Sequence, residues 1–355
     1  MKSIILCAGK GTRLRPLTYT SAKHLIPIGN KPVLFYGIEA IKNCGIKDVG
    51  IIIGETGEDI RQETGSGQRW GVNISYIEQK EALGLAHAVK VAANFLGEEK
   101  FLMYLGDNLL KCGIEDYAQK FLQERYNAFV LLTEVEHPEQ FGVAEVRGGK
   151  VIRVVEKPKE PPSNLALIGV YFFDKNVHQA INSIKPSARG ELEITDAIQW
   201  MIEQGFKIGA EVIKGWWKDT GKPEDILEAN RLVLEDIERD IKQGRADEGS
   251  SILGRVKIEE GAELINSKIL GPAIIGRGAR IIDSYIGPFT SLSERVEIVN
   301  SEIEYSVVLG NTKIKNVNGR LQRCLIGKGV QICHSQDLPR VFKFILGDHS
   351  SLDLM

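Results

Sequence analysis

The chain has 355 residues, of which 43% are hydrophobic and 26% charged, and such a composition excludes a disordered, collagen-like or coiled-coil description of the whole. Its formal net charge of −2 leaves no basic surplus for nucleic-acid binding, and no apolar run approaches the roughly 18 residues of a membrane span. Five scattered cysteines lack metal-binding spacing. We therefore expect reduced thiols in a cytoplasmic protein that binds neither nucleic acid nor membrane.

The first 240 residues alternate short β-branched runs with amphipathic helical stretches. We expect strands at 3–7, 49–53, 74–77, 101–105 and 129–135, and helices at 32–44, 57–64 and 83–95. This alternation predicts an α/β domain whose mostly parallel sheet is covered on both faces. We expect this domain to span residues 1–240 and to close with a charged helix that runs from 223 to about 242. Residues 241–251 have the composition of a linker.

A different periodicity begins after this linker. Aliphatic residues recur at intervals of five or six, and three intervals make a cycle of 17 residues. One aliphatic residue per face is the hexapeptide pattern of a parallel β-helix, whereas a β-sandwich would alternate with period two. The segment 341–346 is expected to cover the last coil or add a strand. The repeating residues are Ile258, Leu264, Ile269, Ile275, Ile281, Ile286, Leu292, Ile298, Ile303 and Leu309.

The first predicted strand leads into a glycine-rich loop at Gly9 and Gly11, followed by Arg13. Glycines let the backbone approach a phosphate closely, and arginine offers a forked donor to it. The dinucleotide fingerprint fails because Leu14 replaces its third glycine, and the P-loop fails because glycine, not Ser or Thr, follows Lys10. The loop is thus a phosphate site of another kind or a simple turn between strand and helix.

Charged residues that could complete such a site lie elsewhere in the chain. Lys23 follows Arg13 by ten residues, and Asp107 follows the strand at 101–105. Asp219 ends another extended run, 112 residues beyond Asp107. Two carboxylates together with substrate phosphates are a common Mg²⁺ site, although each aspartate alone is more often a turn or cap residue.

Seven motifs of this chain occur in the same order as in the sugar-1-phosphate nucleotidyltransferases. The chain resembles the members of that family that carry a C-terminal β-helix. The resemblance covers essentially the whole chain. It implies a Rossmann-like mixed, mostly parallel sheet in a catalytic domain (1–240), then a left-handed parallel β-helix with a C-terminal tail (252–355). The matching segments are 9–13, Lys23, 105–108, 141–143, 156–158, 188–196 and 217–221.

The reaction implied by the resemblance is attack of a sugar 1-phosphate on the α-phosphorus of dTTP, with glucose 1-phosphate as the sugar and pyrophosphate leaving. Asp107, also a catalytic residue, and Asp219 would hold Mg²⁺. Arg13 would act on the pyrophosphate, Lys23 near the α-phosphorus and Lys157 on the sugar phosphate. The implied substrate-binding residues are Ala8, Gly9, Gly11, Thr12, His24, Gln79, Gly84, Asn108, Gly142, Glu156, Gly169, Arg189 and Trp217.

The nucleotide base is less clearly specified by these motifs. Gln79, before Gly84, can pair with the imide edge of thymine or uracil because an amide both donates and accepts. His24 stands where the family usually has glutamine after the active-site lysine. An imidazole can donate to a base carbonyl but cannot copy the amide, so UTP remains an alternative to dTTP, and simple packing remains an alternative role for His24.

Two other functional classes fit these residues less well. A bifunctional enzyme would also transfer an acetyl group in the β-helix, but the coils from Ile258 to Ile326 contain no histidine to act as base. A regulatory subunit without catalysis would not need Arg13, Lys23 and Asp107 together. We expect the β-helix to serve homo-oligomerisation, as a trimer or tetramer, because closed symmetric assemblies are the norm.

Overall fold

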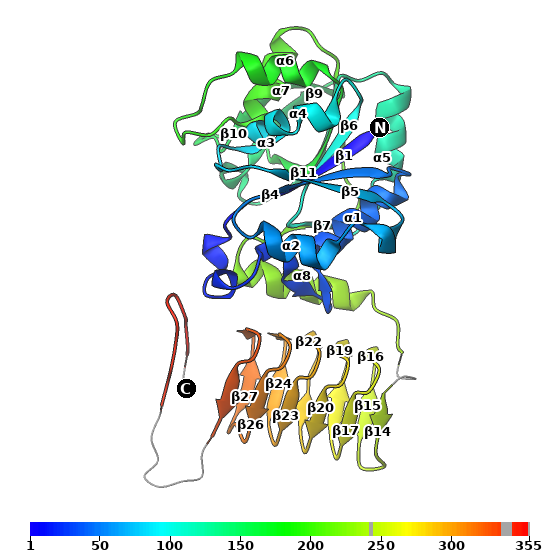
Figure 1. Ribbon diagram of the computed structural model, residues 1–355, viewed down its shortest axis with the longest axis vertical. Coiled ribbons are helices and arrows are strands. Elements are labelled where there is room, and N and C mark those ends of the chain that lie inside the picture. Colours follow the sequence, from blue (N-terminus) through cyan, green and yellow to red (C-terminus); the bar gives the residue numbers. More distant parts are fainter. Residues whose placement is uncertain (241–243, 335–342, 354–355) are drawn as a thin grey trace. The chain divides into compact units, whose positions relative to one another are not determined.

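A computed structural model describes residues 1–240, 244–334 and 343–353 of the chain (Figure 1). Its contacts divide the chain into two compact units. The first contains Met1–Gly11, Ser21–Leu25 and Val33–Asp219, and the second contains Thr12–Thr20, Ile26–Pro32 and the described residues from Thr220 onward. The chain thus changes unit near residue 220, ahead of the expected boundary at 240. No described helix is long and apolar enough to cross a membrane.

The first unit is built on a mixed nine-stranded sheet (Figure 1). β1 lies between β4 and β6 and is parallel to both, and β4 continues in parallel to β5. β11 is antiparallel to β6, β8 and β9, so the sheet is mixed, as expected. Its strands are β1 (Lys2–Cys7), β4 (Asp48–Ile53), β5 (Asn73–Glu78), β6 (Phe101–Leu105), β8 (Ala128–Glu134), β9 (Gly142–Arg147), β10 (Lys150–Glu156), β11 (Leu165–Phe173) and β12 (Ile208–Val212).

Helices cover both faces of this sheet because its strands are apolar on both sides. One core joins the sheet to α3, α6 and α7, and a second joins it to α1, α2 and α5 (Figure 1). The expected helix at 83–95 is divided into α3 and α4. The helices are α1 (Val33–Asn43), α2 (Gly57–Thr64), α3 (Leu85–Val91), α4 (Ala93–Leu96), α5 (Glu115–Gln123), α6 (Asn176–Ser183) and α7 (Ile194–Glu203).

Short elements complete the two units. β7 (Asn108–Leu110) and β13 (Trp217–Asp219) form an antiparallel pair in the first unit. β2 (Pro27–Ile28) and β3 (Lys31–Pro32) form another in the second. The 3₁₀ turns are η1 (Thr12–Leu14), η2 (Leu17–Tyr19), η3 (Lys23–Leu25), η4 (Gln68–Trp70) and η5 (Pro138–Gln140).

The second unit is a left-handed β-helix whose three parallel sheets form its sides (Figure 1). The first sheet holds β14 (Arg245–Ala246), β17 (Glu263–Ile265), β20 (Arg280–Ile282), β23 (Glu297–Val299), β26 (Lys313–Lys315) and β29 (Gln331–Cys333). The second holds β15 (Ser251–Leu253), β18 (Lys268–Leu270), β21 (Tyr285–Ile286), β24 (Glu302–Glu304) and β27 (Arg320–Gln322). The third holds β16 (Val256–Ile258), β19 (Ala273–Ile275), β22 (Thr290–Leu292), β25 (Val307–Val308) and β28 (Leu325–Ile326).

The predicted aliphatic residues fill the core of the coils, with one exception. Those from Ile258 to Ile303 are at most 2% exposed. Leu292 then pairs with Val308, which is fully buried, whereas the expected residue Leu309 is partly exposed. This coil is one residue shorter than 17 because the corner before β25 lacks the extra residue that Pro288 provides in the previous coil.

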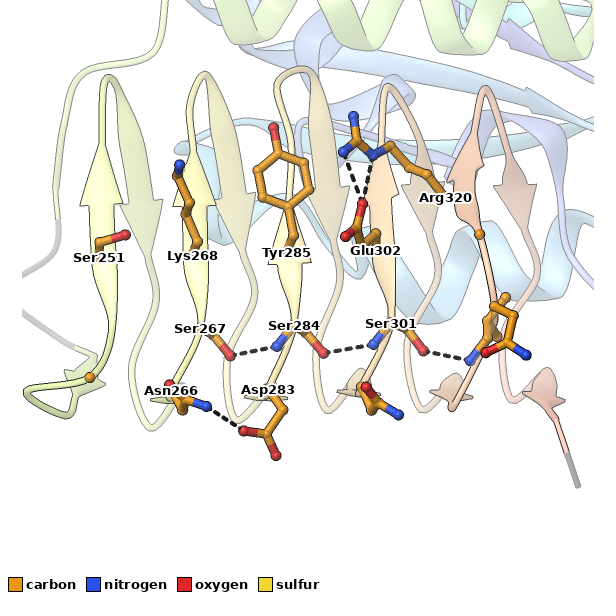
Figure 2. A pocket seen from close by; sticks show the side chains of 15 residues that line it. Ser251, Asn266, Ser267, Lys268, Asp283, Ser284, Tyr285, Ser301, Glu302 and Arg320 are labelled. Carbon is orange, nitrogen blue, oxygen red and sulfur yellow. Dashed lines mark hydrogen bonds and ion pairs between the residues drawn. The ribbon is translucent and has the colours of Figure 1, made fainter. Parts of the chain in front are cut away.

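Serines stack along one corner of the coils and connect successive turns (Figure 2). Ser284 Oγ accepts from the amide of Ser301 at 3.2 Å and donates to the carbonyl of Ile282 at 2.6 Å. Ser267 makes the same two bonds one coil earlier. The preceding corner residues have φ between 44° and 48°, a left-handed conformation that Asn and Asp tolerate. They are Asn266, Asp283 and Asn300.

One side of the β-helix is covered by α8 (Pro223–Glu235), which belongs to the same unit. Asn230 accepts from the hydroxyl of Ser291 at 2.7 Å and from the amide of Gly29 at 2.9 Å. Tyr305 donates to Glu228 at 2.9 Å. The third sheet is therefore the covered side.

The ends of this unit differ from expectation. The expected helix at 223–242 ends at Glu235, and β14 already pairs with β17 inside the expected linker. In the expected C-terminal strand, residues 341 and 342 lie outside the described residues, and Lys343–Leu346 form no strand. Ile345 is 91% exposed.

We expect Ser284→Ala to destabilise the β-helix by about 1–3 kcal/mol, because the buried amide of Ser301 loses its acceptor. Urea unfolding of this variant, compared with that of the wild type, measures the loss. Ser251→Ala is the matched control, since Ser251 is exposed on the first coil. Equal stability of the two variants would contradict this role for the serine stack.

Candidate active site

The carboxyl ends of β1, β4 and β6 meet at one edge of the sheet because these strands are parallel. There is no room for side chains where their following loops meet. A Cβ on Gly54 would lie 2.8 Å from the carbonyl oxygen of Ala8, and one on Gly106 would lie 2.5 Å from Cys7 Sγ. Glycine at these positions lets the loop after β4 lie against the loop after β1, and lets the loop after β6 lie against the end of β1 itself.

Three charged residues converge at this edge. Lys23, in η3, forms an ion pair and hydrogen bond with the carboxylate of Asp107. Asp219 lies opposite Asn108 in the pairing of β13 with β7, and its charge acts on Lys23. A Cβ on Gly9 would lie 3.1 Å from Lys23 Cε, so the lysine side chain lies against the glycine loop. The charges of Asp107 and Asp219 therefore both act on Lys23.

Electrostatics keeps both members of the ion pair charged. Burial would raise the pKa of Asp107, but the charge of Lys23 and the hydrogen bonds from Lys23 and Asn108 hold it well below its usual range. Burial would lower the pKa of Lys23, but the charge and hydrogen bond of Asp107, together with the charge of Asp219, raise it. The edge therefore presents a cation between two carboxylates at neutral pH.

His24 is enclosed, which differs from its expected contact with the base. Its side chain is 1% exposed, and its ring lies 3.1 Å from where a Cβ of Gly106 would be. Burial, followed by the charge of Lys23, lowers the pKa of His24 to about 3. Nδ1 has no hydrogen-bond partner among the described residues. The ring is a neutral packing group beneath the loop of Asp107.

Asn108 connects the strands around Asp107. Its Oδ1 accepts from Trp217 Nε1 at 2.6 Å and from the amide of Gly169 at 3.2 Å. Its Nδ2 donates to Asp107 Oδ1 at 3.0 Å. A Cβ on Gly169 would lie 2.6 Å from Asn108 Oδ1. Because Asn108 is 1% exposed, its side chain fixes Asp107 and Trp217 in place.

The predicted base-binding residues lie together after β5. Gln79 Nε2 donates to the carbonyl of Gly84 at 3.3 Å and lies 3.0 Å from His87 Nδ1. His87 was not among the predicted site residues, although it follows Gly84, Leu85 and Ala86 directly in the chain. Gly84 has φ +100°, which disfavours any residue with a side chain.

A second group of predicted residues gathers around Glu156 at the end of β10. Glu156 Oε2 accepts from Thr195 at 3.2 Å and lies 3.1 Å from where a Cβ of Gly142 would be. Arg189 pairs with Glu156 at 3.3 Å and with Glu193 at 2.8 Å. Burial, then the charge of Glu193, raises the pKa of Glu156, while Arg189 opposes the rise. Thr195 and Glu193 lie within the motif segment 188–196, but neither had a predicted role of its own.

The remaining predicted residues are placed as follows. Lys157 is exposed, has φ +39°, and its amide donates to the carbonyl of Phe141 at 2.9 Å. Thr12 and Arg13 are exposed in η1 of the second unit, and Gly11 has φ +63°. Within the described part of the chain, no cluster of three or more His, Cys, Asp or Glu residues could hold a metal ion.

We expect His24 to make the protein less stable in acid. Its pKa is about 3 in the folded chain and about 6.5 when unfolded, so the unfolded chain binds more protons below pH 6.5. Between pH 7 and 5 this costs about 2 kcal/mol, a loss that His24→Gln should not show in denaturant titrations. His137→Gln, which alters an exposed side chain, is the control. An equal acid loss in all three proteins would contradict this assignment.

Comparison with known proteins places this geometry in a family. The nucleotidyl transferase family model matches residues 2–236. A glucose-1-phosphate thymidylyltransferase of Streptomyces griseus is 50% identical over 99% of this chain and 98% of its own. The low-salt glycan biosynthesis nucleotidyltransferase Agl11 of Haloferax volcanii is 49% identical over all of both chains.

A solved structure of a putative glucose-1-phosphate thymidylyltransferase from Bacillus anthracis, in complex with a sucrose, has 40% identity and a TM-score of 0.63. The match covers 68% of this chain and 98% of that one. The two curated relatives thus match this chain over essentially its whole length. The chain belongs to the nucleotidyl transferase family.

Proposed function

We propose that the protein transfers a thymidylyl group from dTTP to glucose 1-phosphate, giving dTDP-glucose and pyrophosphate. The observation that carries the proposal is the convergence of Asp107, Asp219 and Lys23 beside Gly9. Relatives of matching length that are named glucose-1-phosphate thymidylyltransferases support the choice of substrates.

The chemical problem in this reaction is the repulsion between two phosphorylated substrates. A phosphate oxygen of the sugar attacks the α-phosphorus, the bond to the β-phosphate oxygen breaks, and pyrophosphate leaves with the electron pair. Catalysis of this kind depends on positioning and charge neutralisation rather than a protein nucleophile. Lys23 would neutralise charge near the α-phosphorus, and Arg13 would stabilise the pyrophosphate.

The other residues would hold the substrates. Gly9, Gly11 and Thr12 would line the triphosphate, and Gln79 would pair with the base. Lys157 and Arg189 would contact the sugar phosphate, while Glu156 would accept hydrogen bonds from the sugar hydroxyls. Ala8, Gly84, Gly142, Gly169 and Trp217 would shape the pockets.

The carboxylates of Asp107 and Asp219 are hard oxygen donors that fit Mg²⁺, which commonly uses one or two carboxylates plus substrate phosphates. When bound, Mg²⁺ would neutralise phosphate charge shared between the two substrates. The chain's own contribution is to keep the carboxylate of Asp107 ionised, because the charge of Lys23 and the hydrogen bonds from Lys23 and Asn108 hold its pKa well below the usual range despite burial.

We also propose that the protein works in the cytoplasm as a homo-oligomer, a trimer or tetramer, assembled through its β-helix. The free thiols of all five cysteines support the location. Light scattering on the purified protein measures the assembly, and a monomeric mass would contradict it.

The direct test mixes the protein with glucose 1-phosphate, Mg²⁺ and either dTTP or UTP and measures pyrophosphate. We expect release with dTTP at a higher kcat/KM than with UTP. Glucosamine 1-phosphate in place of glucose 1-phosphate tests the choice of sugar. A preference for UTP would reassign the nucleotide, and no release with either triphosphate would refute the function.

Asp107→Asn should lower turnover by a factor on the order of 10³, because the edge loses one of its two carboxylates while the side-chain shape is kept. The same pyrophosphate assay measures the loss, and thermal unfolding checks the fold. Asp116→Asn, which alters an exposed side chain in the first turn of α5, is the matched control and should keep full activity. An active Asp107→Asn protein would remove the carboxylate from its proposed role.

A further inference from the structure

The segment between α6 and α7, residues 184–193, connects the predicted base-binding and sugar-binding groups. On the base side, the amide of Leu192 donates to the carbonyl of Leu83 at 2.8 Å. The amide of Ala86 donates to the carbonyl of Leu192 at 3.0 Å. A Cβ on Gly84 would lie 2.5 Å from the oxygen of Leu192. The backbone at Leu192 therefore follows any movement of the loop next to Gln79.

On the sugar side, the same segment is fixed by Glu193, which is 3% exposed. Its Oε1 accepts from the hydroxyl of Ser187 at 2.8 Å, and from Nε and Nη2 of Arg189 at 3.2 and 2.8 Å. Nη2 of Arg189 also reaches Glu156 Oε1 at 3.3 Å. A single buried carboxylate oxygen thus closes the loop on itself and directs its arginine toward Glu156.

Glu191 provides a contrast within the same loop. It also pairs with Arg189, but at 3.5 Å, and its side chain is 39% exposed. Charge-assisted hydrogen bonds from a guanidinium are strong when they are short and shielded from water, and exposed pairs contribute little. Glu193, rather than Glu191, therefore determines where Arg189 points.

We propose that Glu193 is a positioning residue that holds Arg189 against Glu156 and, through Leu192, couples occupancy of the base pocket to affinity for the sugar phosphate. The inference rests on the proposed function, because it assigns these two pockets to the two substrates. A nucleotide that orders the loop at Gln79 and Gly84 also orders Leu192 and Glu193. The sugar phosphate then meets an arginine and a glutamate that are already in place, so it binds more tightly.

The test measures this coupling directly by isothermal titration calorimetry in Mg²⁺. Glucose 1-phosphate is titrated into the full-length protein with and without the unreactive α,β-methylene analogue of dTTP. We expect the analogue to tighten sugar-phosphate binding at least roughly five-fold in the wild type. In Glu193→Gln the ratio of the two affinities should fall close to one, whereas Glu191→Gln should keep the wild-type ratio.

Substitution of a residue that matters only for folding would lower both affinities for glucose 1-phosphate alike and leave their ratio unchanged. A wild-type ratio close to one, or an unchanged ratio in Glu193→Gln, would therefore overturn the proposal. If Glu193→Gln does not fold, Ser187→Ala removes one of the three donors and keeps the arginine pair. An intermediate ratio is then expected, and an unchanged one refutes the coupling.

The pyrophosphate assay on the same wild-type preparation separates the two proposals. If the wild type turns over and Glu193→Gln leaves the ratio of the two sugar-phosphate affinities unchanged, only the proposed role of Glu193 is refuted. Absence of turnover and of sugar-phosphate binding counts against the function itself, and the coupling fails with it.

Discussion

The buried ion pair between Lys23 and Asp107 is the interaction on which the candidate active site depends. Asp107 and Asp219 come from distant parts of the chain, and without a cation their charges would repel in a place largely removed from water. A buried charge that loses its partner is strongly destabilising. Gly9 leaves the space that the Lys23 side chain occupies, and Gly106, next to Asp107, leaves space for Cys7 and His24. The strand order, the loop glycines and the opposite charges thus all favour the ion pair of Lys23 and Asp107 at this edge of the sheet.

Much of the fold follows from periodicity, and the failures have a local cause. The periodicity of the aliphatic residues predicts the coils, because each inward-facing position recurs once in every turn of the β-helix. It failed at Leu309 because Val307, Val308 and Leu309 are consecutive and equally apolar, so only the length of the corner decides which one is buried. It also gave no sign that α8 packs with the coils, since an amphipathic helix can cover any apolar surface.

The candidate site was predictable where residue chemistry is distinctive and not where it depends on neighbours. Asp107 and Asp219 stand out in the sequence because carboxylates at strand ends are informative, and Lys23 stands out through its spacing from Arg13 and the order of the motifs. The sequence leaves His24 either a base contact or a packing residue, and the choice depends on Gly106, which follows another strand and lies against its ring. Glu193 resembles an ordinary acidic residue before a helix, and only the folded loop shows three donors on one of its oxygens. The roles of His24 and Glu193 depend on packing between distant segments, which a single sequence does not reveal.

The serine-linked coils have a consequence for how proteins of this kind can change over evolutionary time. Each turn contacts only the turns before and after it, so gain or loss of one complete repeat leaves the remaining side chains in register. The coil that carries Ser291 is constrained, however, because Asn230 of α8 binds it. Duplication or deletion should therefore be tolerated better in coils that no other segment contacts, so the length of the stack could drift without disturbing the catalytic half.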